Sequence, residues 1–370
     1  MSPGLRHAAL VVGVAAWWNV PLRAQDWLFV EGLIDVEGWI THAESRLLAR
    51  NQGDPGPVGR LTLWTGVALH PRVQLLAQGY VEAGSARAGD EGADPEPYVD
   101  QLEIRYLYSR HLVLEVGKIL QPVGAFGPRR YSTSNPLIGA PDSYPTQYPW
   151  GLQASGVAGA WDYRIGMVSL PLFRPGYTPQ PGHRARAAGG AGITPVTGFR
   201  IGLSGTYGPY LSADLASQLP PGGGAWHSYQ QAVIAGDLRF SRGYLEVRAE
   251  VARSWYDAPT AGVLNGDAEY VELKYTWTPR FFTATRWERN NYPFIRPVAP
   301  TFWIANVVAL YDGEVGAGYR VGRNGLVKLS FRKDYWDVDA ADRGRFPNGY
   351  AAAVQVAHRF NPLSWIGWSR

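Results

Sequence analysis

Alternation with a period of two runs through most of this chain and limits the folds that it can adopt. Between residues 30 and 40, one face carries apolar or small residues, whereas Glu31, Asp35 and Glu37 lie on the other, with Leu33 and Trp39 as exceptions. Segment 244–251 repeats the pattern with glutamate and arginine on its polar face. Because successive side chains of a β-strand point to opposite faces, each such segment is predicted to be a strand with one apolar and one charged face.

A charged face on nearly every strand disfavours a soluble sandwich, in which the apolar face looks inward and the charges look outward. No segment reaches the roughly 20 apolar residues of a membrane-spanning helix, and none is helical enough to cover an apolar sheet. A closed barrel is the other structure that satisfies every backbone polar group inside a bilayer. We therefore expect an all-β fold, a transmembrane antiparallel β-barrel with an apolar outer wall and a wet interior.

Turn signals divide the chain into about sixteen predicted strands. Seven short connections alternate with eight long ones rich in glycine, proline and charge, as periplasmic turns alternate with external loops in such barrels. An even number of strands returns both termini to the periplasm. The predicted strands are 28–42, 60–70, 72–84, 98–109, 111–119, 151–161, 163–170, 185–194, 198–205, 229–240, 243–255, 268–277, 280–289, 306–321, 326–336 and 349–360.

One of these strand assignments depends on the topology more than on the pattern. Segment 185–194 is mostly glycine and alanine and has little periodicity. We keep it as a predicted strand because, without it, the tight turn after residue 240 would lie on the external side of the membrane instead of the periplasmic side. Within the following external loop, residues 209–219 are expected to form a short helix.

The first 24 residues have the pattern of a secretion signal. Arg6 precedes an apolar run of eleven residues, and the small residue Ala24 precedes a polar start. A short membrane anchor is the alternative, but eleven residues are too few to cross about 30 Å of hydrocarbon as a helix. The expected organisation is a cleaved signal peptide at 1–24, an outer-membrane barrel at 25–360 and a C-terminal tail at 361–370.

Composition excludes several functional classes. Cysteine is absent, so disulfides and thiolate metal sites are impossible. The formal net charge is only +4 and the basic residues are scattered, so no nucleic-acid partner is expected. The seven histidines show no metal-like spacing, and no hydrolase motif occurs. We expect no metal, no cofactor and no enzymatic activity, whereas 15 tryptophans and 21 tyrosines fit the aromatic girdles of a barrel.

The end of the last predicted strand carries the most specific motif. Its apolar positions Tyr350, Val354, Val356 and Phe360 look like the terminal-strand signal of bacterial outer-membrane proteins. That resemblance implies recognition by the barrel-assembly machinery. The family usually stops at the final aromatic residue, whereas here residues 361–370 follow.

The whole chain resembles Gram-negative outer-membrane porins of the phosphate-selective and related sixteen-stranded type. The stretches that carry the resemblance are Val-Gly-Lys-Ile-Leu-Gln-Pro-Val-Gly at 116–124, Asn-Pro-Leu-Ile at 135–138 and Tyr-Pro-Trp-Gly at 148–151. The resemblance implies a homotrimeric channel in contact with outer-membrane lipid, which passes small hydrophilic solutes and whose third loop folds inward as a constriction. The lysine-rich phosphate ladder of the phosphate-selective members is not evident, so phosphate specificity is not inferred.

Fixed charges at a narrow point set the ion selectivity of a passive pore. The third long loop, at about 120–150, supplies Arg129, Arg130, Tyr131 and Asp142, and no acidic residue lies nearer in sequence to the two arginines than Asp142. The charged residues expected on the pore wall are Glu31, Asp35, Glu37, Glu103, Arg105, Glu115, Arg200, Asp237, Arg239, Arg248, Glu272, Lys274, Arg286, Glu314, Arg320, Lys328 and Arg332.

Each of these roles has an ordinary alternative. An arginine pair in a loop is often merely solvated, and opposite charges across a lumen can pair and brace the barrel. The two signs are nearly balanced, so the sequence indicates neither an anion nor a cation preference. A sugar-stacking path would need inward aromatic residues, for which Trp39, Tyr80 and Tyr244 are the few candidates.

A structural barrel with a plugged lumen, anchoring a surface partner, is the alternative to a channel. The two hypotheses differ in whether the third loop narrows the lumen or fills it. An energy-coupled transporter is disfavoured because the first strand begins too early to leave room for a plug domain.

Overall fold

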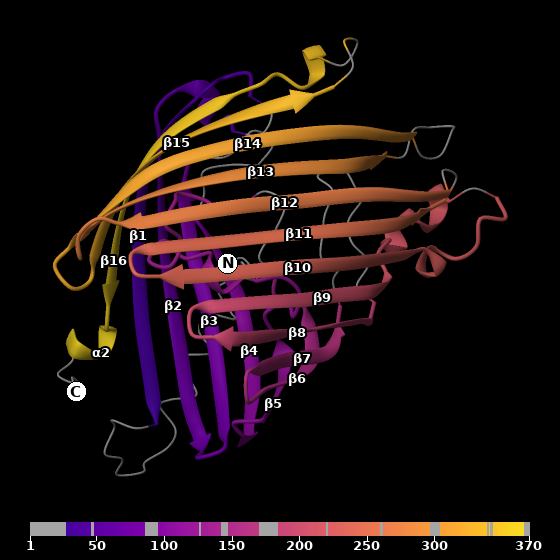
Figure 1. Ribbon diagram of the computed structural model, residues 1–370. Helices are drawn as coiled ribbons and strands as arrows, with labels where there is room; N and C mark the ends of the chain where they lie inside the picture. The colour runs from indigo at the N-terminus through magenta and orange to yellow at the C-terminus, as the bar shows by residue number, and fades with distance from the viewer. Residues whose placement is uncertain are drawn as a thin grey trace.

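Sixteen antiparallel strands form one closed barrel (Figure 1). The computed structural model describes residues 27–45, 48–85, 95–125, 127–141, 147–169, 184–219, 221–259, 262–296, 304–338, 340 and 343–365. The strands are β1 (Leu28–Thr41), β2 (Gly56–His70), β3 (Val73–Gly84), β4 (Glu96–Ser109), β5 (Leu112–Lys118), β6 (Trp150–Ala158), β7 (Trp161–Val168), β8 (Arg186–Val196), β9 (Phe199–Pro209), β10 (Gln230–Arg242), β11 (Leu245–Ala258), β12 (Gly262–Thr276), β13 (Phe281–Arg296), β14 (Ile304–Val321), β15 (Gly325–Asp337) and β16 (Tyr350–Phe360).

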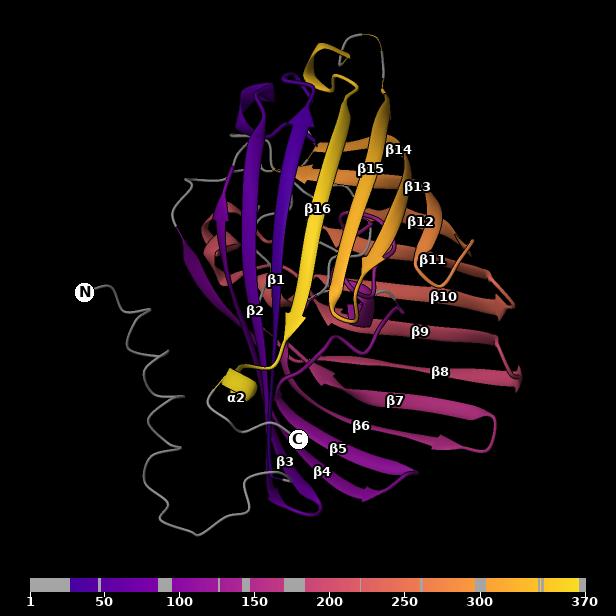
Figure 2. The same ribbon diagram turned by 90° about the vertical axis from the view of Figure 1, so that its left-hand side faces the viewer.

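Each strand pairs with its neighbours in sequence, and pairing between β1 and β16 closes the ring (Figure 2). The short helices are η2 (Asn51–Gly53), η3 (Gly127–Arg129), η4 (Ala213–Gln218), η5 (Trp226–Ser228), η6 (Arg343–Arg345) and α2 (Pro362–Trp365). In the part of the chain that the structure describes, no helix has the length and apolar character needed to cross a membrane.

All sixteen predicted strands are confirmed, including the weakly periodic one, which is β8. The predicted boundaries are wrong mainly at the ends that carry the long loops. β2 begins four residues before the predicted position 60, because its pairing with β1 continues to Trp39–Gly56 through a segment whose glycine and proline residues are typical of a loop. β12 likewise begins at Gly262 rather than 268. The helix expected at 209–219 is the shorter 3₁₀ helix η4.

The two faces of the wall differ as the alternation predicts. On β1, Ile34, Val36 and Ile40 are exposed on the outer surface, whereas Asp35 and Glu37 are buried inside. An apolar outer surface and a polar interior are the reverse of a soluble protein and are typical of a barrel in lipid.

Exposed aromatic side chains gather at both ends of this outer surface. We call the end with the short connections the short-turn end, and the opposite end the long-loop end. The aromatic residues at the short-turn end are Tyr106, Tyr108, Trp161, Tyr244, Tyr275, Trp277, Phe281 and Tyr319. Those at the long-loop end include Trp150, Tyr207, Tyr335 and Tyr350. Tryptophan and tyrosine favour the headgroup level of a bilayer, so the two groups mark its two surfaces.

A glycine and an aromatic ring meet where the barrel closes. Gly32 on β1 pairs with Phe360 on β16, and a Cβ atom built on Gly32 would lie 2.2 Å from the Phe360 ring. The chain then turns into α2, whose Trp365 stacks on Phe360 with a centroid distance of 5.0 Å. The predicted signal peptide, residues 1–24, and the end of the tail, residues 366–370, lie outside the described residues.

Candidate functional site

The segment between β5 and β6 crosses the interior of the barrel. We call residues 119–149 the internal loop. The backbone N–H of Gly124 donates to Ser204 Oγ on β9 at 3.1 Å, and the Ser132 hydroxyl donates to Asp35 on β1. Because β1 and β9 lie on opposite sides of the ring, the loop reaches from one wall to the other (Figure 2).

One lysine holds three carbonyl groups of this loop. Lys328, on the inner face of β15, is fully buried. Its Nζ donates to the carbonyl oxygens of Ser132 at 3.0 Å, Asn135 at 3.0 Å and Leu137 at 2.7 Å. An ammonium group has three donors, and here all three are used on one turn of the loop.

A buried ionic network continues this attachment along the wall. Arg286 on β13 donates to Glu314 at 2.6 Å and to Glu288 at 3.1 Å, and also to the loop carbonyl of Gly139 at 3.2 Å. Glu314 in turn accepts the backbone N–H of Ile138 at 3.1 Å. The loop is therefore bound to β13, β14 and β15 by both charges and hydrogen bonds.

The strand register explains why these charges coexist. Glu272, Arg286, Glu314 and Arg332 occupy directly paired positions on β12 to β15, with alternating sign. Opposite charges that face each other across strands are favourable. A buried charge without such a partner would be costly.

The two predicted constriction arginines both have acidic partners from the wall. Arg129 is only 8% exposed and donates to Glu272 on β12. Arg130 donates to Asp100 on β4. Strands distant in sequence bring Glu272 and Asp100 to the loop, so both arginines have acidic partners that their sequence neighbourhood does not show. Asp142 itself lies outside the described residues.

Aromatic rings surround Arg130. Its guanidinium carbon lies 5.6 Å from the ring centre of Tyr80, and 5.2 Å from those of Tyr131 and Tyr148. The hydroxyl groups of Tyr131 and Tyr148 are 3.0 Å apart. Burial, with the neighbouring Tyr131, raises the pKa of Tyr148 above its ordinary value, so this phenol stays neutral. Cation–π contacts of this kind hold an arginine in one orientation.

Beside the internal loop lies a cavity of about 400 Å³. Its walls come from β1, β2, β3, β15 and β16 and from the loop itself. Arg60 enters it with Glu82 as its partner and with Glu37 at 3.9 Å. The lining residues with ionic or aromatic side chains are Asp35, Glu37, Trp39, Arg50, Arg60, Tyr80, Glu82, Arg130, Tyr131 and Lys328.

Two of the three inward aromatic candidates line this cavity, namely Trp39 and Tyr80. The third, Tyr244, is exposed at the short-turn end. Trp39 donates its indole N–H to Glu37 at 2.8 Å and lies under the guanidinium of Arg50 at 4.7 Å. Its ring face is therefore already in contact with the protein.

A row of three arginines lies on the wall at β9, β10 and β11. Arg239 directly faces Arg200 on one side and Arg248 on the other. Like charges opposite each other are unfavourable unless they are compensated. Arg200 is paired with Asp162 and Asp237, and Arg248 with Glu246 at 3.4 Å. Arg239 makes a longer contact of 3.9 Å with Asp237, and its side chain is 39% exposed. This row is a positive surface that faces the lumen.

The remaining predicted wall residues lie apart from the internal loop in local pairs. Arg105 bridges Glu103 at 2.9 Å and Glu115 at 2.6 Å. Lys274 pairs with Glu246, and Glu31 pairs with Arg359 at the closure of the barrel. Arg320 donates to the carbonyl of Pro279 at 2.9 Å at the short-turn end. Local pairs of this kind can brace the barrel, which is the alternative to a role in ion selectivity.

Further charged residues of the site were missed from the sequence, among them Arg60, Glu82, Asp100 and Arg164. The first two lie on the inward parity of strands that were predicted, so alternation could have found them. Asp100 lies at an irregularity in the pairing of β3 with β4, which breaks the period of two. Arg164 is inward on β7 and donates to the carbonyl of Gly124.

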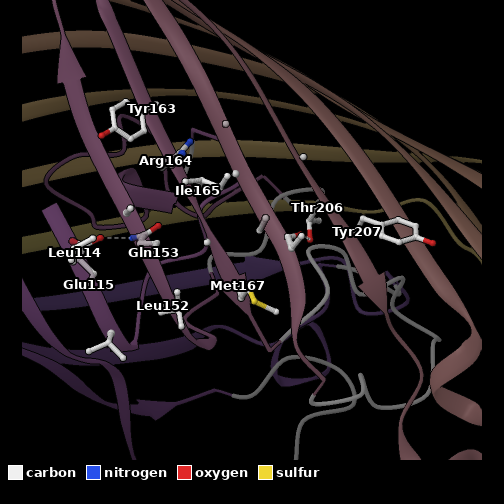
Figure 3. Close-up of a pocket in the computed structure, with 18 of the residues that line it drawn as sticks. Leu114, Glu115, Leu152, Gln153, Tyr163, Arg164, Ile165, Met167, Thr206 and Tyr207 are labelled. Atoms are coloured by element: carbon white, nitrogen blue, oxygen red, sulfur yellow. Dashed lines mark hydrogen bonds between the residues drawn. The ribbon is translucent and has the colours of Figure 1, made fainter. Parts of the chain in front are cut away.

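A second cavity lies on the outer wall rather than in the lumen. It measures about 1340 Å³ and is a shallow apolar groove across β4 to β10 (Figure 3). Its lining includes Leu114, Leu152, Ile165, Met167 and Tyr207. Glu115 and Arg164 also border it, but most of the lining is apolar. Among the described residues, no cluster of three or more histidine or acidic side chains could hold a metal ion.

Comparisons with known proteins identify the fold. No family model matches the chain, and no curated protein matches it in sequence. Among solved structures, OmpF of Salmonella typhi, in a complex with daunomycin, is 11% identical and superposes with a TM-score of 0.60, covering 90% of this chain and 97% of its own.

Two other solved structures give the same picture. The anion-selective porin from Comamonas acidovorans has 9% identity and a TM-score of 0.61, with coverages of 90% and 99%. OmpT, an outer membrane protein of Vibrio cholerae, has 8% identity and a TM-score of 0.56, with coverages of 92% and 100%. The chain therefore has the fold of sixteen-stranded Gram-negative outer-membrane porins, as the sequence resemblance implied.

Proposed function

We propose that this protein is an outer-membrane channel through which small hydrophilic solutes and ions diffuse passively, assembled as a homotrimer. The observation that carries the proposal is the charged cavity of about 400 Å³ between the internal loop and the wall formed by β1, β2 and β3. A barrel that only anchored a surface partner would not need an ordered, charged cavity beside the internal loop.

The attachment of the internal loop supports conduction rather than a plug. Its buried contacts to Lys328, Arg286 and Glu314 draw one part of it against β13 to β15. The cavity lies beside that attachment, toward β1 to β3. Other contacts of the loop reach β1, β4 and β9, but the cavity beside the attached part supports a passage that the loop narrows without filling it.

A modest preference for anions comes from the arginine row, because the charges that line the cavity are balanced once Asp100 is counted. Four basic and three acidic residues line the cavity, but Asp100 compensates Arg130 from outside the lining. The arginine row adds a further positive surface, of which Arg239 is the most exposed member. In a confined passage fixed charges act on ions over short distances and are screened less than at an open mouth, where the Debye length is about 8–10 Å.

Reconstitution in a planar bilayer tests this function. The folded barrel should give discrete conductance steps, grouped in threes for a trimer. In a salt gradient the reversal potential should have the sign of a weak anion preference. Arg60→Gln should reduce that preference, whereas Arg242→Gln, at an exposed turn position, should leave it unchanged. Folded protein that inserts without any conductance would establish the plugged barrel instead.

A further inference from the structure

The chain continues past the aromatic residue that ends β16 and folds back against the barrel. Residues 361–365 form a turn and the short helix α2, which lies against β1. Figure 2 shows α2 beside the end of β16 at the closure of the barrel. Residues 361–365, Asn-Pro-Leu-Ser-Trp, contain no charged side chain. We call this stretch the terminal turn.

The stacking of Trp365 places the terminal turn on the outer side of the wall. Val354 and Val356 are exposed on the outer face of β16, and Phe360 has the same parity. The Trp365 ring lies parallel to the Phe360 ring, with an interplanar angle of 4°. Trp365 therefore covers an outward-facing residue, and it is itself 73% exposed.

The level of this exposed ring matches the aromatic girdle at the short-turn end. Phe360 ends β16 at the same end of the barrel at which Trp277, Phe281 and Tyr319 are exposed on neighbouring walls. An indole ring combines an apolar body with one polar N–H, and such rings concentrate at the headgroup level. The girdle thus continues across the closure of the barrel through Trp365, a residue that lies beyond the last strand.

We propose that the terminal turn is an interfacial anchor, in which Trp365 inserts into the lipid headgroup layer at the short-turn end and covers the β1–β16 closure. Phe360 is then enclosed between Gly32 on one side and Trp365 on the other. The partner is the membrane surface itself, because the turn is uncharged and continuous with the lipid-facing girdle. The proposal does not depend on conduction by the lumen.

Site-specific fluorescence tests the anchor, because the chain has no cysteine and an introduced thiol is unique. Ser364→Cys carries an NBD probe next to Trp365 in the full barrel, folded into phosphatidylcholine–phosphatidylglycerol vesicles. Interfacial segments lie about 5–10 Å into the headgroup boundary. Lipid nitroxides at the headgroup or at acyl position 5 should therefore quench the probe roughly twofold more than nitroxides at position 12. Aqueous iodide should not quench it.

Matched cysteine variants calibrate the depth. Arg323→Cys, in the turn between β14 and β15 at the same end, should be quenched by iodide. Val354→Cys, on the outer face of β16, should respond most to the position-12 nitroxide. If the probe at residue 364 behaves like that at residue 323, the terminal turn is in water and the proposal is wrong.

Substitution of the ring itself separates insertion from mere proximity. In the Ser364→Cys background, Trp365→Ala should abolish the headgroup quenching and admit iodide, whereas Trp365→Phe should retain most of the lipid quenching. Heat-modifiable gel mobility reports whether each barrel is folded. Unchanged quenching in folded Trp365→Ala would overturn the role of the indole ring. Conductance measured on the same samples keeps this result separate from the channel proposal.

Discussion

Replacement of Lys328 by methionine should release the internal loop while leaving the barrel closed. The variant removes three charge-assisted hydrogen bonds to loop carbonyls. Methionine is unbranched and of similar length, so it can occupy the space without a large cavity. The backbone pairing of β15 with β14 and β16 does not involve the side chain.

The contacts set the size of the effect. Hydrogen bonds to a charged group contribute about 1.5–3 kcal/mol each, but contributions within one cluster are not additive. Removal of one partner from a buried charged contact costs about 3–5 kcal/mol, and we take this range for the three bonds together. At about 1.4 kcal/mol per tenfold, the equilibrium between the held and released loop should shift by roughly two to three and a half orders of magnitude.

Single-channel recording and limited proteolysis measure this shift. Lys328→Met should show larger mean conductance, more open-channel noise and cleavage within the internal loop. Lys274→Met is the matched control, because Lys274 also lies on the inner wall but pairs with Glu246 rather than with the described part of the loop. If Lys328→Met keeps wild-type conductance, noise and protease resistance, then Lys328 does not hold the loop.

Three further predictions concern the lumen and the closure. Arg239→Glu with Arg248→Glu should move the reversal potential toward cations at low salt, because it reverses two members of the arginine row; an unchanged potential would place that row outside the ion path. Gly32→Val should lower the fraction of heat-modifiable folded barrel, since its Cβ would lie 2.2 Å from the Phe360 ring; Gly313→Ala, which has open space around its Cβ position, should not. Phe360→Ala should reduce the amount of protein that reaches the outer membrane in fractionated cells, and a normal level would assign recognition by the assembly machinery to another segment.

Alternation predicted the strands well because it reports a local property. Each residue of β1 faces either lipid or lumen according to its parity, so the identities of Ile34, Asp35 and Val36 are enough to assign the faces. The same logic correctly put Arg286 and Lys328 on the inner wall. It failed at strand ends such as Gly56, where a glycine that pairs in a strand cannot be distinguished from one in a loop.

The partners of the site could not be predicted, because they depend on register and closure. Arg129 and Glu272 are 143 positions apart, and they meet only when the loop crosses the lumen. Asp100 was hidden by an irregularity that shifts the register between Gln78 and Gly79 on the partner strand. A one-residue shift reverses the face of every later side chain in a strand, so no inspection of parity could pair Asp100 with Arg130.

The attachment of the internal loop also fixes an order of folding events. The loop follows β5, yet Lys328, which binds its carbonyl groups, lies 196 positions beyond Ser132. Contacts of such large sequence separation form slowly, because a long segment of chain must be closed first. The barrel must therefore bring β15 into its place before Lys328 can hold the loop. Contacts of the loop with β1, β4 and β9 do not depend on β15, so the attachment at Lys328 completes the constriction rather than begins it.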